Sequence, residues 1–298
     1  MAASFLLSHN VSYFIFQIDS NGRVTGFAEK PKGEALKAWT VDTTILGLSP
    51  EVAREMPYIA SMGIYVFKKL VLLDLLNKTY PSANDFGSEI IPNAAKTLKV
   101  QAYAFNGYWE DIGTIRSFFD ANLALAKDPA RFEFYDAGAF FHLSKKYLLI
   151  CFFAVNPIYT SPRFLPPSKL MACKVKEAIV AHGVYMDQCE VERAIIGVRS
   201  RIEAGVKIKD AMIIGADFYE SDEQRADLLA RGRVPVGIGA GSVISNAIID
   251  KNARIGKNVK ITNATGVDEA AREDKGYYIR SGIVVILRNG EIPDGTII

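Results

Sequence analysis

The sequence predicts two domains of different class, an α/β domain in its first half and a parallel β-helix in its last third. The clearest observation is a six-residue period of isoleucine or valine, which recurs in three series. The series are Ile196, Ile202, Ile208 and Ile214; Val243, Ile249, Ile255 and Ile261; and Ile286, Ile292 and Ile298. Because this period fits neither an α-helix nor an alternating strand, it indicates short strands wound into a coil, with one aliphatic residue stacked on the next.

The first half alternates strand and helix patterns, which is typical of an α/β layer structure. A hairpin is expected over residues 13–27, with its turn at Asn21-Gly22, and buried strands are expected at 41–48 and 61–67. Two helices are expected, each with one apolar side: residues 68–77, with Leu70, Leu73 and Leu76, and a helix after Thr114, with Ile115, Phe118, Phe119 and Leu123.

A cluster of prolines separates the two patterns, at Pro157, Pro162, Pro166 and Pro167. The predicted division is an α/β domain over 1–136, a linker over 137–169 with an atypical insertion at 140–156, and a β-helix over 170–298. A helix is expected to interrupt the β-helix at 221–231, because Ser221 and Gln224 have capping-box spacing and Gly232 follows.

Composition excludes some classes of partner. The formal net charge of +2 gives no electrostatic reason to expect nucleic acid or an anionic membrane. The longest apolar run, residues 147–155, is too short for a membrane-spanning helix, which needs roughly 20 residues. The three cysteines show no paired metal-binding spacing, which favours a reducing compartment. The first ten residues have no clear transit-peptide pattern.

Four polar segments of the first domain could carry chemistry. Glu29 and Lys30 stand at a strand end before a proline and glycine turn, where a lysine can hold a phosphate. Ser61 offers a hydroxyl among small residues, and residues 84–89 could form a loop and helix cap. Asp111 comes just before a helix, so its carboxylate could bind a divalent metal or simply favour the helix N-terminus. Taken singly, each segment also fits an ordinary structural role.

Together and in order, these segments resemble one family. The run FAEKPKG, VDTTILGL, IASMGIYVF, ANDFGSEIIP and YWEDIGTI, followed by SPRFLPPSK, IIGVRSRI, IIDKNARIG and YYIRSGI, resembles ADP-glucose pyrophosphorylase (glucose-1-phosphate adenylyltransferase) of plants and green algae. The resemblance covers residues 14–139 and 157–298. The stretches YVFKK, GTIRSFFDANLAL and GYYIRSGIVVIL are similar to the large, regulatory subunit rather than the small one.

The resemblance implies a fold and a reaction. The fold is a truncated nucleotide-sugar transferase (Rossmann-like) α/β domain followed by a left-handed parallel β-helix of hexapeptide repeats. The reaction joins ATP and glucose 1-phosphate into ADP-glucose and pyrophosphate with Mg²⁺, in starch biosynthesis. By the same resemblance the chain works in a plastid, within a heterotetramer that contains small subunits.

The resemblance also implies roles for individual residues. Glu29 and Lys30 match residues at the sugar and its phosphate, Ser61 matches a sugar-pocket residue, and Asp111 matches a metal-binding aspartate. Three further residues match regulatory positions: Lys251 and Arg280 for the activator 3-phosphoglycerate, and Arg163 for the inhibitor phosphate. The alternative for Arg280 is a purely structural ion pair with Glu273 or Asp274.

The sequence departs from the family pattern in two places. It contains no glycine-rich G-x-G-x-R-L segment to cradle ATP phosphates, so we expect a truncated subunit that is inactive alone. Phe140 to Asn156 interrupts the pattern, and a mis-spliced segment is preferred over a genuine extra element. A non-catalytic regulatory or assembly subunit of the same heterotetramer remains the alternative. A hexapeptide-repeat acyltransferase is disfavoured, because no histidine lies within the β-helix series.

Overall fold

The computed structural model describes residues 2–7, 14–105, 107–130, 132–133, 156–157 and 163–298, and its contacts divide the chain into two units, Met1–Trp109 and Glu110–Ile298. This division differs from the boundary predicted at residue 136. The reason is that helix α5 (Ile115–Ala124) packs on strands of the second unit. All but the last residue of the predicted insertion at 140–156 lie outside the described residues.

The first unit is a mixed sheet flanked by short helices, with strand order β3-β2-β4-β1-β5. Its strands are β1 (Ala2–Leu7), β2 (Phe14–Ile18), β3 (Val24–Glu29), β4 (Tyr58–Tyr65) and β5 (Ala102–Ala104). Its α-helices are α1 (Glu34–Lys37), α2 (Pro50–Glu55), α3 (Lys69–Asp74) and α4 (Ile91–Thr97). Both faces of the sheet are covered, because Phe16 and Ile59 pack with Ala95 of α4 while Ile15 and Ala60 pack with Trp39.

The predicted hairpin is confirmed. Strands β2 and β3 pair antiparallel, and the turn between them ends at Gly22, which has a positive φ of 74°. The Asp19 carboxylate accepts hydrogen bonds from the backbone N–H groups of Asn21 and Arg23, both at 2.9 Å, and so fixes the turn.

The strand predicted at 41–48 is wrong. Residues Thr43–Leu46 form a short 3₁₀ helix, because the Asp42 carboxylate accepts hydrogen bonds from the Thr44 N–H (3.0 Å) and hydroxyl (2.6 Å). Gly47, with φ 87°, ends the turn. This local side-chain cap competes successfully with the extended conformation that the apolar residues suggested.

The apolar side predicted for the helix at 68–77 is also wrong. Leu70 is 76% exposed and Leu73 is 42% exposed, whereas Leu75 is 4% exposed. Helix α3 packs through Val71 together with Leu75, and of the three predicted leucines only Leu76 packs against this cluster. The α-helix ends at Asp74 and continues as a π-helix over Leu75–Thr79. A second π-helix spans Phe86–Ile90.

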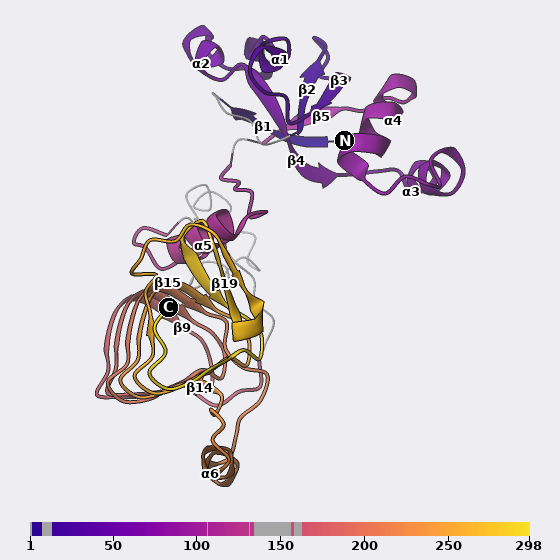
Figure 1. The fold of residues 1–298 in the computed structure, drawn as a ribbon. Helices are drawn as coiled ribbons and strands as arrows, with labels where there is room; N and C mark the ends of the chain where they lie inside the picture. Colours follow the sequence, from indigo (N-terminus) through magenta and orange to yellow (C-terminus); the bar gives the residue numbers. More distant parts are fainter. Residues whose placement is uncertain (1, 8–13, 106, 131, 134–155, 158–162) are drawn as a thin grey trace, which may run out of the picture. The chain divides into compact units, whose positions relative to one another are not determined.

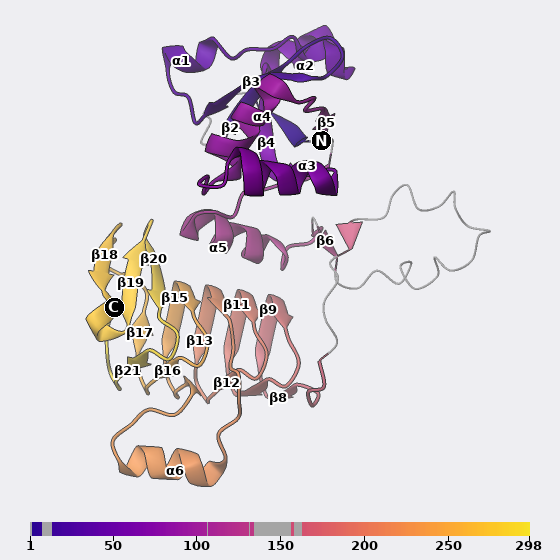
Figure 2. The same ribbon diagram turned by 90° about the vertical axis from the view of Figure 1, so that its right-hand side faces the viewer.

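The second unit is a parallel β-helix, as predicted, whose coils stack along one axis (Figures 1 and 2). Its longer strands form one ladder: β9 (Lys174–Val180), β11 (Glu190–Ile196), β13 (Lys207–Ile213), β15 (Val243–Ile249), β20 (Ile283–Ile286), β19 (Tyr277–Arg280) and β18 (Ala270–Arg272). Its shorter strands form another: β8 (Lys169–Met171), β10 (Tyr185–Asp187), β12 (Arg201–Ile202), β14 (Gly237–Ile238), β16 (Arg254–Ile255) and β21 (Glu291–Ile292). Strand β17 (Lys260–Ile261) pairs with β15, and β6 (Phe132–Glu133) pairs with β7 (Asn156–Pro157).

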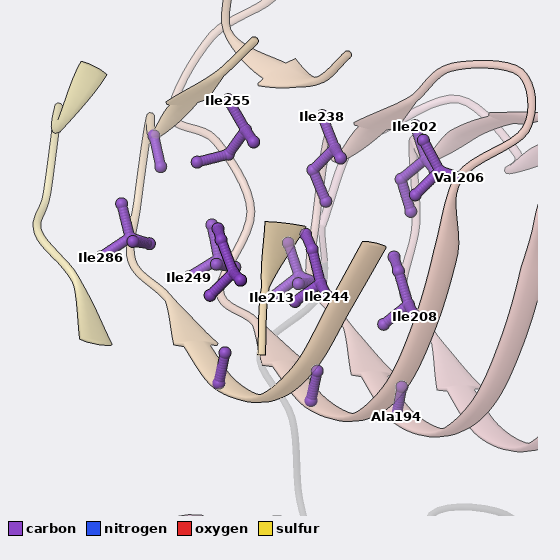
Figure 3. Packing of buried hydrophobic residues seen from close by; sticks show 14 of the residues in the cluster. Ala194, Ile202, Val206, Ile208, Ile213, Ile238, Ile244, Ile249, Ile255 and Ile286 are labelled. Carbon is purple, nitrogen blue, oxygen red and sulfur yellow. The ribbon is translucent and has the colours of Figure 1, made fainter. Parts of the chain in front are cut away.

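Most residues of the six-residue series lie in the core of the coils, which Figure 3 shows from inside. Two members are wrong by one position, because Ile213 and Ile244 are buried instead of Ile214 and Val243. The four seven-residue strands β9, β11, β13 and β15 each bend at a residue with positive φ, such as Asp210 (φ 47°). Across that corner the spacing between core residues is five rather than six, as from Ile208 to Ile213.

Helix α5 covers the outside of one face of the β-helix. Phe119, which is 3% exposed, packs on Met212, Ile248 and Val285, which point outward from neighbouring strands. The predicted apolar side of this helix is therefore confirmed. Its start is fixed by Thr114 and Ser117, which form reciprocal capping hydrogen bonds.

The predicted excursion helix is confirmed as α6 (Asp222–Ala230), with both capping contacts between Ser221 and Gln224 present. Glu220 stabilises the base of this excursion, and its side chain is only 6% exposed. Its carboxylate lies 2.8 Å from the Arg254 guanidinium and 3.8 Å from that of Arg225, and accepts a hydrogen bond from the Val236 N–H at 2.9 Å. Within the described part of the chain, no helix is long and apolar enough to cross a bilayer.

Candidate functional site

Three of the four polar segments singled out in the first domain meet on one region of its sheet. Glu29 of β3 pairs with Phe14 of β2, and Ser61 of β4 lies one position beyond the Ile15–Ala60 pair on the other side of β2. Residues directly opposite in antiparallel strands share a face, so Glu29, Phe14 and Ser61 form one row. At about 4.8 Å between strands, Glu29 and Ser61 are roughly 10 Å apart along that row.

Lys30 ends strand β3 in a left-handed backbone conformation, with φ 43°. Few residues other than glycine adopt this conformation, and here it precedes Pro31. The Lys30 ammonium lies 6.0 Å from the centroid of the Phe14 ring, within cation–π range. Lys30 therefore projects over the row formed by Glu29, Phe14 and Ser61.

The loop at 84–89 also approaches this row. Gly87 lies against the Phe14 ring, where a Cβ atom would come within 2.9 Å of the ring carbons. The Asp85 carboxylate caps the following helical turn by accepting hydrogen bonds from the Ser88 N–H (2.6 Å) and hydroxyl (2.8 Å). These bonds hold the pKa of Asp85 below its usual value, with a smaller contribution from the positive charge of Lys30.

Ser61 is the buried member of the group, at 6% exposure. Its hydroxyl lies 3.0 Å from the Tyr65 hydroxyl and accepts a hydrogen bond from the Gly63 N–H at 3.2 Å. Burial raises the pKa of Tyr65 above its ordinary value, so this phenol stays protonated at neutral pH. The region thus offers a cation, a carboxylate and two hydroxyls on one face, a donor set suited to a sugar phosphate.

Asp111 belongs to the second unit and is described within that unit alone. It is exposed, and its Oδ1 atom accepts a hydrogen bond from the Gly113 N–H at 2.8 Å. No group of three or more His, Cys, Asp or Glu side chains that could hold a metal occurs among the described residues. A single carboxylate still fits Mg²⁺, which commonly takes one or two protein carboxylates and fills its other positions with waters and substrate phosphates.

The structure gives Lys251 two neighbours that the sequence did not suggest. The Lys251 ammonium lies 2.9 Å from Asp217 Oδ1, and the Arg288 guanidinium lies 2.8 Å from Asp217 Oδ2. The pKa of Asp217 is lowered by its hydrogen bonds from Lys251 and Asn252 and by the charge of Arg288. Two cations thus converge on one carboxylate at a corner of the β-helix, where an anionic ligand could take the place of that carboxylate.

Arg280 lies elsewhere on the β-helix. It pairs with Ile283 at one end of β20, whereas Lys251 lies beyond the other end, two residues after the Ile249–Ile286 pair. At about 3.3 Å per residue, the step from Ile283 to Ile286 alone spans roughly 10 Å. Lys251 and Arg280 thus lie beyond opposite ends of β20 and form separate ion pairs, with Asp217 and Glu269 respectively.

Arg280 forms an ion pair with a nearby carboxylate, as the structural alternative expects, although the partner is a different residue. Its guanidinium pairs with Glu269 at 3.2 Å, not with Glu273 or Asp274, and lies 5.4 Å from the centroid of the Tyr278 ring. The antiparallel hairpin of β18 and β19 brings Glu269 into this position. Arg163 is exposed on the segment that leads into β8, outside any strand or helix.

The sequence alone did not indicate Phe14, Asp217 or Arg288, nor the contact of Gly87 in segment 84–89 with the Phe14 ring. Phe14 and Gly87 carry no local signal, because their closeness depends on strand pairing between distant segments. Asp217 and Arg288 are separated by 71 positions and meet only because the coils of the β-helix stack. The only sequence signal for the contact between Asp217 and Arg288 is the six-residue period, from which successive coils can be aligned.

Two comparisons with known families account for most of the chain. Residues 8–128 match the family model of the nucleotidyl transferase, and residues 163–297 match that of the GLGC left-handed parallel β-helix domain. The second match confirms the handedness expected for the coil. The chain thus consists of a nucleotidyl transferase domain followed by a GLGC left-handed parallel β-helix domain.

Proposed function

We propose that the chain is a subunit of glucose-1-phosphate adenylyltransferase, of the large-subunit type, acting in starch biosynthesis. The observation that carries the proposal is the succession, in one chain, of a nucleotidyl transferase domain and a GLGC β-helix. We further propose that it works in a plastid and assembles with small subunits into a heterotetramer. Its ligands would then be ATP, glucose 1-phosphate and ADP-glucose.

The proposed reaction needs charge neutralisation above all. A phosphate oxygen of glucose 1-phosphate attacks the α-phosphorus of ATP, and pyrophosphate leaves, so two anionic groups must be brought together. Lys30 would hold the sugar phosphate, while Glu29 and Ser61 on the same row would accept or donate hydrogen bonds to the sugar hydroxyls. By the family resemblance, Asp111 of the second unit would supply one carboxylate to Mg²⁺, which contributes positive charge when bound.

Lys30→Ala is expected to raise the KM for glucose 1-phosphate by about 10- to 100-fold, because a charge-assisted contact is worth roughly 1.5–3 kcal/mol. The measurement is pyrophosphate release by the chain assembled with a small subunit. Lys32→Ala, two residues further along the same exposed turn, is the matched control and should leave the KM unchanged. If Lys30→Ala and Lys32→Ala changed the KM equally, or if neither changed it, Lys30 would not belong to the sugar-phosphate site.

The second candidate function is a non-catalytic regulatory or assembly subunit of the same heterotetramer. It is favoured by the position of Lys251 and Arg288, two cations that lie together on the β-helix through their shared partner Asp217. These cations would bind the activator 3-phosphoglycerate, and the exposed Arg163 would bind inhibitory phosphate. An unchanged KM in the Lys30→Ala assembly, together with altered activation on loss of Lys251, would select this candidate.

Lys251→Ala and Arg288→Ala are each expected to raise the half-activating concentration of 3-phosphoglycerate by about 10- to 100-fold. Because both cations face one position, the double change should cost less than the sum of the two single changes. If Arg280 also contributes, it does so from a separate place, so Lys251→Ala and Arg280→Ala should add. The measurement is the activation curve of the assembled enzyme for each variant.

Two outcomes would contradict the assignment of Lys251 and Arg288 to one ligand position and of Arg280 to a separate place. Strong coupling between Lys251 and Arg280 would mean that one ligand reaches both. A lower melting temperature with an unmoved activation curve in Arg280→Ala would mean that Arg280 only pairs with Glu269.

A further inference from the structure

Two cysteines occupy the same corner in the first two coils of the β-helix. The corner is identified by a repeated hydrogen bond between coils: Lys174 N–H to Cys189 O, Glu190 N–H to Val206 O, Lys207 N–H to Ser242 O, and Val243 N–H to Val259 O. Cys173 stands directly before Lys174, so it holds the equivalent position in the end coil. The residue before each cysteine, Ala172 (φ 51°) and Gln188 (φ 42°), makes the same left-handed bend.

The two thiols face each other. The Sγ atoms of Cys173 and Cys189 are 3.5 Å apart, and both cysteines are free. They flank the in-register pair of β9 and β11 that joins Lys174 to Glu190. In-register residues of neighbouring strands have Cα atoms about 4.8 Å apart, within the range of roughly 4.4–6.8 Å that a disulfide spans. Closing the bond needs the sulfur atoms to approach to about 2.05 Å, which side-chain rotation and a small backbone shift can supply.

Packing alone does not require cysteine at this corner. The third and fifth coils place Val206 and Val259 there, both fully buried, and the fourth places Ser242. A metal site is not indicated either, since the described residues include no cluster of three or more His, Cys, Asp or Glu side chains that could hold an ion. What distinguishes the first two coils is a pair of thiols in contact at the end of the coil stack.

We propose that Cys173 and Cys189 form a redox-active dithiol that closes to a disulfide under oxidation by a peroxide. The Cys173 thiolate attacks the O–O bond of hydrogen peroxide and becomes a sulfenic acid, and the displaced hydroxide leaves as water. Cys189 then gives up its proton and attacks the Cys173 sulfur as a thiolate, and the hydroxide displaced from the sulfenic acid takes up a proton and leaves as a second water. The two sulfur atoms together lose two electrons, and the peroxide gains them.

The environments of the two thiols fit this order of events. Cys173 is partly exposed, whereas Cys189 is only 1% exposed. Burial and the neighbouring Cys173 raise the pKa of Cys189 to about 12. Because the thiolate is the reactive form, Cys173 meets the oxidant first and the buried Cys189 resolves the sulfenic acid.

The disulfide would fasten the end coil to the coil behind it. Strands β8 and β9 stand at one end of their ladders, as Figure 2 shows. Among the described strands each pairs with one neighbour only, and Leu170 (44% exposed) and Val175 (40% exposed) are open on this coil. A covalent link should therefore slow local opening of the end coil most, and this effect is independent of the proposed enzymatic function.

The test treats the folded full chain with stoichiometric hydrogen peroxide and maps disulfides by mass spectrometry of non-reduced peptides. Cys151→Ser removes the third cysteine, and Cys189→Ser in that background removes the resolving thiol. We expect a Cys173–Cys189 disulfide that dithiothreitol reverses, and a sulfenic acid at Cys173 in the Cys189→Ser variant that dimedone traps. Amide exchange of residues 174–180 should slow by about tenfold or more on oxidation, because exchange there follows local opening.

Three results would overturn the proposal. These results are a disulfide that forms only in denaturant, a disulfide that uses Cys151 when it is present, and peroxide products on Cys173 without pairing. Val259→Ala serves as the control for core packing, because it removes a buried side chain from the same corner in the fifth coil, three coils beyond Cys189. It should leave the yield of disulfide unchanged.

Discussion

Replacing Glu220 with alanine is expected to lower the free energy of unfolding of the β-helix by about 3–5 kcal/mol. The change leaves two guanidinium groups, of Arg225 (16% exposed) and Arg254 (18% exposed), without their shared carboxylate. It also leaves the Val236 N–H without its acceptor. Removing one member of a buried ion pair is costly because the remaining charge stays desolvated. Urea denaturation followed by circular dichroism measures the effect.

The matched control for Glu220 is Asp227→Ala on the same excursion. Asp227 pairs with Arg231 at 2.9 Å, but both side chains are more than half exposed. An exposed pair at this helical spacing contributes only about 0.3–0.5 kcal/mol. If Glu220→Ala and Asp227→Ala had equally small effects, the network at the base of the excursion would not be a stabilising feature.

Ile244→Ala is expected to lower the free energy of unfolding by about 2–5 kcal/mol, because it opens a cavity in the middle of the coil stack. Ile244 is fully buried and pairs in register with Ile208 and Ile261 of the neighbouring coils. Figure 3 shows its side chain among the other core isoleucines. The same denaturation experiment measures this change.

The adjacent residue supplies the control, because Val243 was the member of the six-residue series predicted from the sequence. Val243 is only partly buried, so Val243→Ala should lower the free energy of unfolding by less than about 1 kcal/mol. A larger loss at Val243 than at Ile244 would mean that the strand faces the core in the other register.

The β-helix could be predicted from the sequence because its core repeats along the chain. Ile196, Ile202 and Ile208 all lie in the core, and their spacing of six residues is visible in the sequence. The slip at Ile214 could not be predicted, since it depends on a left-handed residue, Asp210, which looks like any other polar residue of the strand. Helix α6 was predictable for a different reason, because its capping contacts are local to Ser221 and Gln224.

The first unit was less predictable because its apolar segments are short. The segment around Thr43 reads as a strand by composition, yet one Asp42 carboxylate is enough to start a 3₁₀ turn. Leu73 was predicted as buried from an α-helical pattern, but helix α3 packs through Val71 together with Leu75 instead. In such cases the local hydrogen bonds decide the backbone, and hydrophobic periodicity is a weaker indicator.

The candidate site was predictable only in its individual members. Glu29, Lys30 and Ser61 could be named from local chemistry and the family resemblance, and the strand pairing places Glu29 and Ser61 on one row. Their shared neighbours, Phe14 and Gly87, follow from contacts between segments about 70 residues apart. The partnership of Lys251 and Arg288 likewise required the stacking of coils.

The most direct measurement is a calorimetric titration of the full chain with glucose 1-phosphate, with glucose and 3-phosphoglycerate titrated in parallel. If the nucleotidyl transferase domain holds the sugar phosphate, glucose 1-phosphate should bind saturably at one site per chain, and Lys30→Ala should weaken that binding by about 10- to 100-fold while leaving 3-phosphoglycerate binding intact. Glucose without its phosphate should bind much more weakly, because the charge-assisted contact to Lys30 is lost. Saturable binding of 3-phosphoglycerate with none of glucose 1-phosphate would contradict a catalytic origin for the site and leave the regulatory subunit as the function of this chain.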